Sequence, residues 1–376
     1  KTISYFIKMR VLQIGKFYPI SGGVEKVMYD ITMGLSQKQV YCDMLCASAE
    51  KQDQGNLLLN DYARVLCVPM LSPAMIFRLR KIRKEYDIIH IHHPDPMACL
   101  ALFLSGYKGP VVLHWHSDIL KQKMLLRLYT PLQNWLLRRA KVIVGTTPVY
   151  VKESPFLENI QRKVTSIPIG IDEMKPIPER VAQIKERYAG KKIIFSLGRL
   201  VEYKGYEYLI QAARRLTDDY VILIGGRGPL QEYLQALIDE LGVADRVKLL
   251  GFIEDDDLPD YFGACDLFCL SSILKTEAFG IVQIEAMSCG KPVIAMNIPE
   301  SGVSWVNISS FSGINVKPED AESLAEAILT VLTDKHLYDK LSKGARRRYE
   351  TMFTKELMTE LCLNLYRKVL RSHADR

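Results

Sequence analysis

The chain has 376 residues, of which 48% are apolar, 25% are charged and 9% are aromatic, and its net charge is +7. At roughly 100–200 residues per domain, this length predicts two domains, and the composition excludes collagen-like, disulfide-scaffold and disordered proteins. No apolar stretch in the sequence approaches the roughly 20 residues that a membrane-spanning helix needs, so we do not expect an integral membrane protein.

The N-terminal segment KTISYFIKMRVLQIG mixes apolar residues with Lys8 and Arg10, and no small-residue cleavage site follows it. This pattern argues against a signal peptide. MRVLQIG predicts a first strand with Met9 as a candidate natural initiator, which would leave residues 1–8 as non-native. The eight cysteines lie mostly in apolar runs without a Cys-x-x-Cys pair, which is typical of reduced core thiols and of a cytoplasmic protein.

Strand-like and helix-like segments alternate along the first half of the chain. Strands are predicted for the apolar runs RVLQI, VYCDMLCA, ARVLCVP, DIIHIH, PVVLHWH and KVIVGTT, which longer helical stretches separate. The alternation restarts at KKIIFSLG and continues through YVILIGG, RVKLLGF, DLFCLSS and KPVIAMN. This pattern predicts an α/β protein with two doubly wound parallel-sheet domains in tandem.

The segment IPIGIDEMKPIPER separates the two halves, and its prolines and glycine interrupt both helix and strand. We therefore place the N-terminal domain at residues 1–172 and the C-terminal domain at 173–352. The last segment, 353–376, has helical apolar spacing. We expect it to be a closing helix that returns toward the N-terminal domain.

Positive charge is concentrated in the first half of the chain. Residues 1–176 hold 24 Lys and Arg against 14 Asp and Glu, a net +10, whereas residues 177–376 have a net −3. The segments MIFRLRKIRKEY and 119–141 are both apolar and basic, as interfacial amphipathic helices are, although a core helix with a solvated basic face has the same composition. The charge predicts either an anionic partner, such as a membrane surface, a phosphorylated substrate or nucleic acid, or ordinary surface scatter.

Two glycine-rich turns follow predicted strands. Gly22 and Gly23 open a helix, where backbone amides can approach a phosphate. The turn GGRGPL at 225–230 lies at a strand end, where open α/β sheets bind ligands. Neither turn has the G-x-G-x-x-G spacing, and no acidic residue follows at the ribose-binding position, which argues against a nicotinamide-dependent dehydrogenase.

Charged side chains follow two strands of the second half. Arg199 and Lys204 come after KKIIFSLG, and two cations at such a junction suit a diphosphate. Glu277 and Glu285 lie eight residues apart in TEAFGIVQIEAM, and carboxylates accept hydrogen bonds from the vicinal hydroxyls of ribose or hexose. The amides of residues 279–281 begin the helix between them and are available to an anion.

A metal site is the alternative interpretation of the histidines and of one acidic run. Five of the seven histidines lie near the ends of two predicted parallel strands, without a partnered Cys or a Glu-x-x-His motif. They are His90, His92, His93, His114 and His116. The run EDDDLPD begins a helix, where acidic residues cap the end. We therefore expect no required metal and interpret His116 as a polar residue of the site.

The sequence resembles the retaining family 4 glycosyltransferases of the GT-B fold over nearly its whole length. The resemblance lies in the order and spacing of GGVEKV, HWHSD, IPIGID, GRLVEYKG, GGRGPL, GFIEDDDLPDYF and TEAFGIVQIEAMSCGKPVIA. It implies two Rossmann-like domains that face each other across a cleft, with the acceptor on the N-terminal side and the nucleotide sugar on the C-terminal side.

The resemblance also assigns roles to single residues. Arg199 and Lys204 would hold the diphosphate and stabilise it as it leaves, and Glu285 would bind the ribose hydroxyls. Glu277 would bind hydroxyls of the transferred sugar, with His116 beside it. The other donor contacts would come from Gly22, Gly23, Phe252, Ile253, Phe279, Gly280 and Ile281.

The implied reaction is transfer of a hexosyl group from a UDP- or GDP-linked sugar to a hydroxyl of a glycan or lipid-linked acceptor, with retention and without a metal or other cofactor. The implied setting is the synthesis of bacterial cell-surface polysaccharide or glycolipid, in the cytoplasm or peripherally at the inner face of an anionic membrane, without nucleic acid. The alternatives are a sugar-nucleotide epimerase or phosphorylase of the same fold, and a non-enzymatic basic protein that binds membrane or nucleic acid.

Overall fold

A computed structural model describes residues 9–20, 22–48, 55–69, 73–119, 123–188 and 190–374. The prediction for residues 1–8 lies outside these ranges, as do residues 120–122 of the predicted interfacial segment 119–141. The chain forms two compact units, one of Lys1–Gly170 with Lys355–Arg376 and one of Ile171–Thr354. The C-terminal helix α14 (Lys355–Ala374) is therefore part of the first unit.

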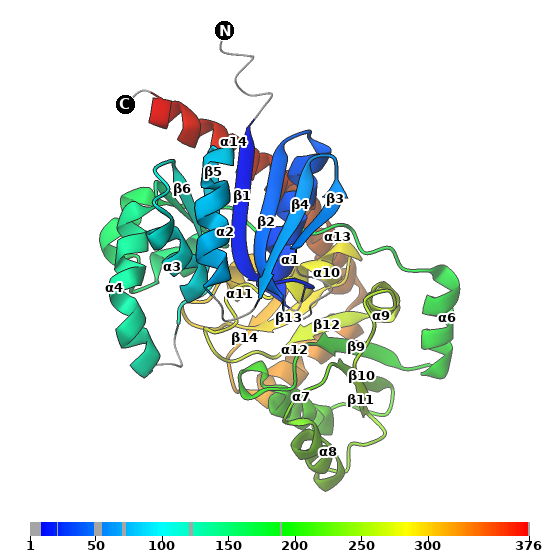
Figure 1. Cartoon of the computed structure of the whole chain (residues 1–376). Coiled ribbons are helices and arrows are strands. Elements are labelled where there is room, and N and C mark those ends of the chain that lie inside the picture. The colour runs from blue at the N-terminus through cyan, green and yellow to red at the C-terminus, as the bar shows by residue number, and fades with distance from the viewer. Residues whose placement is uncertain are drawn as a thin grey trace. The chain divides into compact units, whose positions relative to one another are not determined.

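The first unit contains an eight-stranded sheet in the order β3-β4-β2-β1-β5-β6-β7-β8 (Figure 1). All neighbouring strands pair in parallel except β3 and β4, which are antiparallel. The strands are β1 (Arg10–Phe17), β2 (Tyr41–Ser48), β3 (Gly55–Asn60), β4 (Ala63–Pro69), β5 (Ile88–His93), β6 (Val111–Trp115), β7 (Val142–Gly145) and β8 (Val164–Ser166). The apolar runs of the sequence predict six of them, and β3 and β8 are additions from the structure.

Helices of the first unit form two packed groups. α1 packs against α14, and α3 lies between α2 and α4. The close approach of α1 and α14 depends on Gly34, because a Cβ there would lie 2.1 Å from the hydroxyl of Thr359. The helices are α1 (Gly23–Gln37), α2 (Ala74–Ile82), α3 (Pro96–Ser105), α4 (Lys123–Arg139) and α5 (Pro148–Lys152), with 3-10 turns η3 (Arg83–Glu85) and η4 (Glu158–Lys163).

The second unit contains a six-stranded parallel sheet in the order β11-β10-β9-β12-β13-β14 (Figure 1). This is the strand order of doubly wound nucleotide-binding folds, in which the chain reverses direction across the sheet beside its first strand. The strands are β9 (Lys192–Leu197), β10 (Tyr220–Gly225), β11 (Val247–Gly251), β12 (Leu267–Leu270), β13 (Val293–Met296) and β14 (Gly313–Val316). The predicted fold class is confirmed, and β14 is the one strand of this sheet that the apolar runs do not reveal.

Helices connect consecutive strands of the second unit. β10 is buried along its whole length because such crossover helices cover both faces of a parallel sheet. The helices are α6 (Pro178–Arg187), α7 (Tyr206–Ala212), α8 (Gln231–Glu240), α9 (Leu258–Ala264), α10 (Ile281–Ser288), α11 (Val303–Val306), α12 (Ala321–Thr333) and α13 (Lys335–Met352), with 3-10 turns η5 (Glu202–Lys204) and η6 (Ala213–Arg215).

A row of imidazoles occupies the core of the first unit where β5 and β6 end. His90, His92, His114 and His116 are almost fully buried, and neighbouring rings stack with centroids 4.1–5.4 Å apart. Tyr366 of α14 closes the row, with its hydroxyl 2.6 Å from Nδ1 of His90. Burial lowers the pKa of each of these four rings far below its ordinary value, to about 3 for His114, and neighbouring rings add to the effect for the other three.

This row predicts that the first unit loses stability in acid. Unfolded histidines, with a pKa of about 6.5, bind protons that the buried rings do not, so the free energy of unfolding falls as the pH drops below that value, by about 1.4 kcal/mol per pH unit for each ring. We expect His114→Phe to give a shallower fall than the wild type when urea unfolding is measured between pH 7 and 4.5. His336→Gln, at an exposed position of the second unit, should keep the wild-type slope, and equal slopes in all three proteins would contradict the prediction.

Candidate active site

The charged residues of the second unit lie where the strand order reverses. β9 and β12 are neighbours in the sheet, and the chain leaves them toward opposite sides of it. The connection after β9 carries Arg199 and Lys204, and the connection after β12 carries Glu277 and the start of α10. Ligands of doubly wound sheets bind beyond the carboxyl ends of the strands at this reversal, so the topology places both predicted segments at one binding position.

Lys204 and Glu277 form an ion pair that joins these two connections. Nζ of Lys204 lies 2.5 Å from Oε2 of Glu277, and the two side chains are only 11% and 13% exposed. The hydroxyl of Ser272 donates a second hydrogen bond to the same oxygen at 2.9 Å. Burial alone would lower the pKa of Lys204, but the Glu277 carboxylate, together with Tyr206 and Tyr203, outweighs burial and raises that pKa above its ordinary value, so the lysine is cationic.

Backbone and hydroxyl contacts hold the two connections together around this pair. The hydroxyl of Ser271 donates to the carbonyl of Lys204 at 2.8 Å, and the amide of Ile273 donates to the carbonyl of Tyr203 at 2.9 Å. Gly205 has φ +60°, and a Cβ on it would lie 2.4 Å from the carbonyl oxygen of Ser271. A glycine is therefore required at this position both by its backbone conformation and by the close approach.

Helix α10 begins beside the ion pair. Its N-cap is Gly280, which has φ +74° and offers no side chain, so the first amides of the helix face outward from its positive end without a capping group. Phe279 is buried, and its carbonyl accepts a hydrogen bond from Nε2 of Gln283 at 2.9 Å. The hydroxyl of Ser301 donates to the carbonyl of Glu277 at 2.5 Å, which fixes the turn before the helix.

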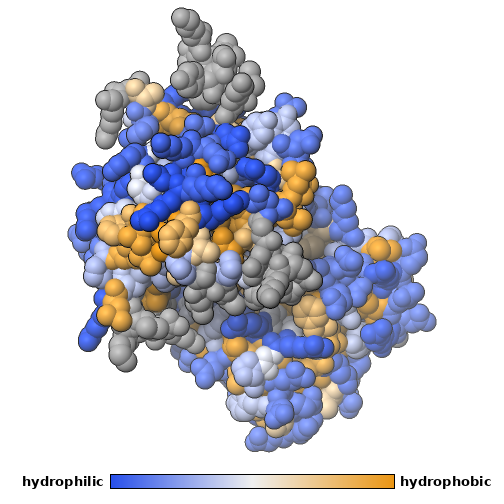
Figure 2. Space-filling view, viewed as in Figure 1, coloured by the Kyte–Doolittle hydropathy of each residue, from blue (hydrophilic) through white to orange (hydrophobic). Residues whose placement is uncertain are grey.

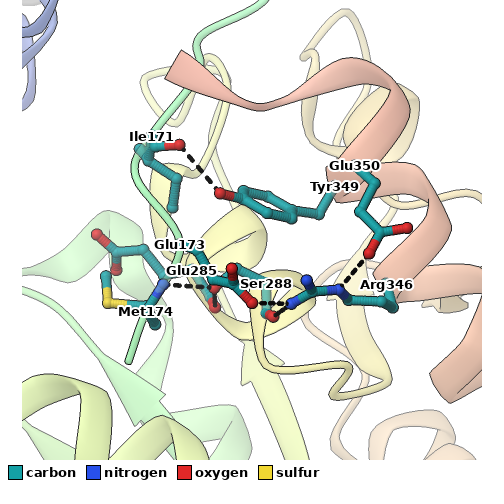
Figure 3. Close-up of polar contacts among 8 residues, drawn as sticks. All are labelled: Ile171, Glu173, Met174, Glu285, Ser288, Arg346, Tyr349 and Glu350. Atoms are coloured by element: carbon teal, nitrogen blue, oxygen red, sulfur yellow. Dashed lines mark hydrogen bonds and ion pairs between the residues drawn. The ribbon is translucent and has the colours of Figure 1, made fainter. Parts of the chain in front are cut away.

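Glu285 lies in the following turn of α10, and the far end of that helix is tied to the segment that enters the second unit. The hydroxyl of Ser288 donates to the carbonyl of Glu285 at 2.7 Å and accepts from the amide of Met174 at 3.2 Å (Figure 3). Arg346 of α13 bonds the carbonyl of Ser288 and pairs with Glu173 (Figure 3). These contacts fix the orientation of the helix that carries Glu285.

The other donor residues expected in this unit are not members of the ion pair. Arg199 is exposed and belongs to the same connection as Lys204, but it forms no ion pair within the described part of the chain. Ile253 is 8% exposed, whereas the ring of Phe252 is 54% exposed. The guanidinium of Arg227, from the GGRGPL turn, lies 5.8 Å from the centroid of that ring and adds a cation that the sequence analysis did not select.

The predicted residues of the first unit follow β1 and β6. Gly22 is the extended N-cap of α1, and Gly23 is its first residue. His116 follows β6, is 6% exposed, and places Nε2 at 2.9 Å from Nδ1 of His92. Their contact with a donor is a prediction from the resemblance.

A hydrogen-bond chain fixes the protonation of His116. The amide nitrogen of Gln13 donates to Thr32 at 2.7 Å, so its oxygen must accept from Nε2 of His92 at 2.7 Å. Nδ1 of His92 is then an acceptor and receives the Nε2 proton of His116. The neutral His116 ring is left with Nδ1 as an acceptor for a hydroxyl. Gln13 was missed by the sequence analysis, because a lone glutamine inside an apolar strand carries no signal.

Among the described residues, the histidine row also holds the one group of three side chains that could together ligate a metal ion. Nitrogens of His90, His92 and His114 lie within 4.8 Å of one another. The planes of His90 and His114 differ by 3°, and burial lowers the pKa of both rings, which keeps them neutral at neutral pH. The expectation that no metal is required stays a prediction.

Comparison with known proteins assigns the two units to known families. Residues 21–175 match the model described as Glycosyltransferase Family 4, and residues 179–348 match Glycosyl transferases group 1. The chain is 30% identical to the O-antigen chain mannosyltransferase C of Escherichia coli over 97% of this chain and 100% of that protein. It is also 30% identical to the D-rhamnosyltransferase WbpZ of Pseudomonas aeruginosa, over 92% of each chain.

Solved structures share the fold. HepE of Anabaena, determined in complex with UDP, superposes with a TM-score of 0.77 at 22% identity and covers 96% of this chain and 100% of its own. Sucrose-phosphate synthase of Thermosynechococcus elongatus superposes with a TM-score of 0.79 at 21% identity over 97% and 100% of the two chains. The two Rossmann-like parallel-sheet units are therefore those of the GT-B fold.

The geometry predicts strong energetic coupling between Lys204 and Glu277. Lys204→Met leaves the buried Glu277 carboxylate without its cation, which should cost about 3 kcal/mol of stability, and Glu277→Gln should cost a similar amount for the converse reason. The double variant removes both charges, so its loss should be well below the sum of the single losses. Urea unfolding of the second unit measures all three, and additive losses would contradict the ion pair.

Proposed function

The chain belongs to the glycosyl transferases group 1 family, and from this premise we propose that it transfers a hexosyl group from a UDP- or GDP-linked sugar to a hydroxyl acceptor with retention of configuration. The observation that carries the proposal is the Lys204–Glu277 pair at the strand reversal, beside the open N-terminus of α10. A cation, a carboxylate and uncapped amides at one position suit a ligand that has both a diphosphate and sugar hydroxyls.

The proposed roles follow from charge and position. Lys204 and Arg199 stabilise the negative charge that grows on the leaving diphosphate, and the first amides of α10 face the same anion. Glu277 accepts hydrogen bonds from hydroxyls of the transferred sugar, and Glu285 accepts them from the ribose. Base contacts are assigned to the backbone near Phe252 and Ile253, with Gly22 and Gly23 over the phosphates.

The ion pair argues against Glu277 as a nucleophile. A carboxylate that already neutralises a lysine at 2.5 Å is a weak attacking group, unlike the free carboxylate nucleophile of retaining hydrolases. We therefore assign retention to displacement on one face of the sugar, in which the leaving diphosphate accepts the proton of the acceptor hydroxyl. Protein cations supply the neutralising charge in this scheme, and no metal or other cofactor is required. His116, with Nδ1 as acceptor, is assigned to a hydroxyl of the transferred sugar.

The relatives support a setting for the reaction. One is described as an O-antigen chain mannosyltransferase and another as a D-rhamnosyltransferase. We assign the chain to the synthesis of bacterial cell-surface polysaccharide or glycolipid, with a glycan or lipid-linked acceptor and no nucleic acid partner. An epimerase or phosphorylase of the same fold would consume the nucleotide sugar without elongating such an acceptor, which product analysis distinguishes.

A membrane-facing surface on the first unit suits a lipid-linked acceptor. Helix α3 packs against both α2 and α4, and all three helices carry exposed apolar side chains. These side chains are 38–79% exposed and belong to Phe77 of α2, Phe103 and Leu104 of α3, and Leu128 of α4. Figure 2 shows apolar residues gathered beside hydrophilic ones over this part of the unit, and α2 and η3 contribute Arg80, Lys81, Arg83 and Lys84. In the described ranges, no helix is both long enough and apolar enough to span a bilayer. We infer a cytoplasmic protein that associates peripherally with the inner face of an anionic membrane.

The donor assignment predicts large losses of turnover. Lys204→Ala and Arg199→Ala each remove a cation from the developing diphosphate, which should raise the barrier by about 3 kcal/mol and lower kcat by about 100-fold. The donor is first identified by thermal shift against UDP- and GDP-sugars, and turnover is then measured as elongated acceptor. Lys340→Ala, at an exposed position of α13, is the matched control and should keep the wild-type rate. Normal rates in both site variants would refute the diphosphate roles.

The membrane assignment predicts salt-sensitive binding to anionic vesicles. Basic residues near such a surface contribute about 1 kcal/mol each, and salt screens the attraction. Co-sedimentation should be strong at low salt, weak at high salt and weak on neutral vesicles. Phe77→Ser with Leu128→Ser should reduce it, whereas Leu58→Ser, at a 66% exposed residue of β3, should not. Equal binding to neutral vesicles would remove the membrane from the proposal and leave the donor site unaffected.

A further inference from the structure

The first unit has a cationic pocket at the amino ends of its parallel strands, opposite to their carboxyl ends. The pocket has a volume of about 660 Å³ and is formed by the residues that precede β6, β7 and β8, by the C-terminal end of α4 and by a residue near the end of α14. Its basic lining residues are Lys108, Arg138, Arg139, Lys141, Arg162, Lys163 and His373. The other lining residues are Gly109, Pro110 and Ala140, so no acidic side chain lines it.

Two of the cations are built into the walls. Nζ of Lys163 donates to the carbonyls of Arg138 and Ala140 at 2.8 and 2.9 Å, where α4 ends. The guanidinium of Arg139 donates to the carbonyl of Gly109 at 2.6 Å, just before β6. These contacts join the segments before β6, β7 and β8 to one another.

Other cations line the pocket without such partners. Lys108, Arg138 and Arg162 are exposed, and within the described residues none of their side chains forms an ion pair or hydrogen bond. Like charges this close repel one another. The pKa of Lys163 is lowered mainly by burial, and the nearby charges of Arg162 and Lys141 lower that pKa further. A bound anion would remove that repulsion.

We propose that this pocket is a binding site for a phosphate-bearing ligand with at least two negative charges. Arg138 and Arg162 supply planar forks that match phosphate oxygens, and Lys108 and Lys141 supply compact charges beside them. The volume accommodates a diphosphate or a phospholipid headgroup with its water. Of the residues proposed to bind the donor, Arg199, Lys204, Glu277 and Glu285 lie in the other unit. Gly22, Gly23 and His116 follow the carboxyl ends of β1 and β6, whereas the pocket lies where β6, β7 and β8 begin, and it does not rest on the proposed transferase reaction.

The test uses pyrophosphate as the soluble probe and vesicles containing phosphatidic acid as the lipid probe. Isothermal titration at constant ionic strength compares the wild type with Arg138→Gln/Arg162→Gln and with the matched control Lys340→Gln/Lys368→Gln, two exposed lysines outside the pocket. Any binding of pyrophosphate at the proposed donor site would be the same in all three proteins. We expect the pocket variant to lose roughly 10-fold or more in affinity for each cation removed and the control to retain the wild-type affinity.

The two probes distinguish the sources of the phosphate. Pyrophosphate binding lost only in the pocket variant supports a soluble ligand, and pocket-dependent sedimentation with phosphatidic acid vesicles but not with neutral vesicles supports a lipid headgroup. The pocket variant should also melt no lower than the wild type at low salt, because it relieves repulsion, which separates lost binding from lost folding. If all three proteins bind both probes equally, or none binds either, the proposal is wrong.

Discussion

The second unit is organised around a buried pair of opposite charges. Lys204 and Glu277 are 73 residues apart, yet each is the nearest charged partner of the other, because the chain leaves two neighbouring strands at the same edge of the sheet. Neither charge is stable alone at 11% or 13% exposure, so each connection holds the other in place. Bringing these connections together requires a glycine at 205, where a side chain would collide with Ser271. The hydroxyls of Ser271 and Ser272 then bond Lys204 and Glu277.

That pair also explains how a charged site can exist before its ligand arrives. A lysine and a carboxylate that neutralise each other are held in fixed positions before any ligand binds. In the proposed reaction such preorganised charges would need little rearrangement when a diphosphate and a sugar bind. The first unit instead has buried polar rings without charge, because burial and the neighbouring imidazoles keep these histidines neutral. Gln13 sets the direction of the hydrogen bonds along that row, so His116 offers a defined acceptor.

Strands with long apolar runs could be predicted from the sequence, because both faces of a parallel strand are buried. β3, β8 and β14 could not, since GNLLLN is a short antiparallel edge strand and VTS and GINV are too short to show a period. Lys204 and Glu277 were predicted as separate contributors, but their contact depends on strand order, which local pattern does not encode. Gln13, Ser272, Ser301 and Arg227 become visible only when the fold brings a partner to them.

The two ends of the strands in the first sheet differ in charge. This difference bears on where the net +10 of the first half of the chain is located. At the carboxyl edge the conspicuous side chains are neutral histidines, which contribute nothing to the charge at neutral pH. At the amino edge six lysines and arginines line one pocket without an acidic neighbour in its wall. Parallel strands all start at one end of the sheet and finish at the other. Basic residues placed just before β6, β7 and β8 are therefore brought to a common position by the same topology that gathers the histidines at the opposite end. Part of the excess charge of the first unit is therefore gathered away from the carboxyl ends of the strands. An anionic ligand that binds this charge need not be one that the transfer reaction consumes.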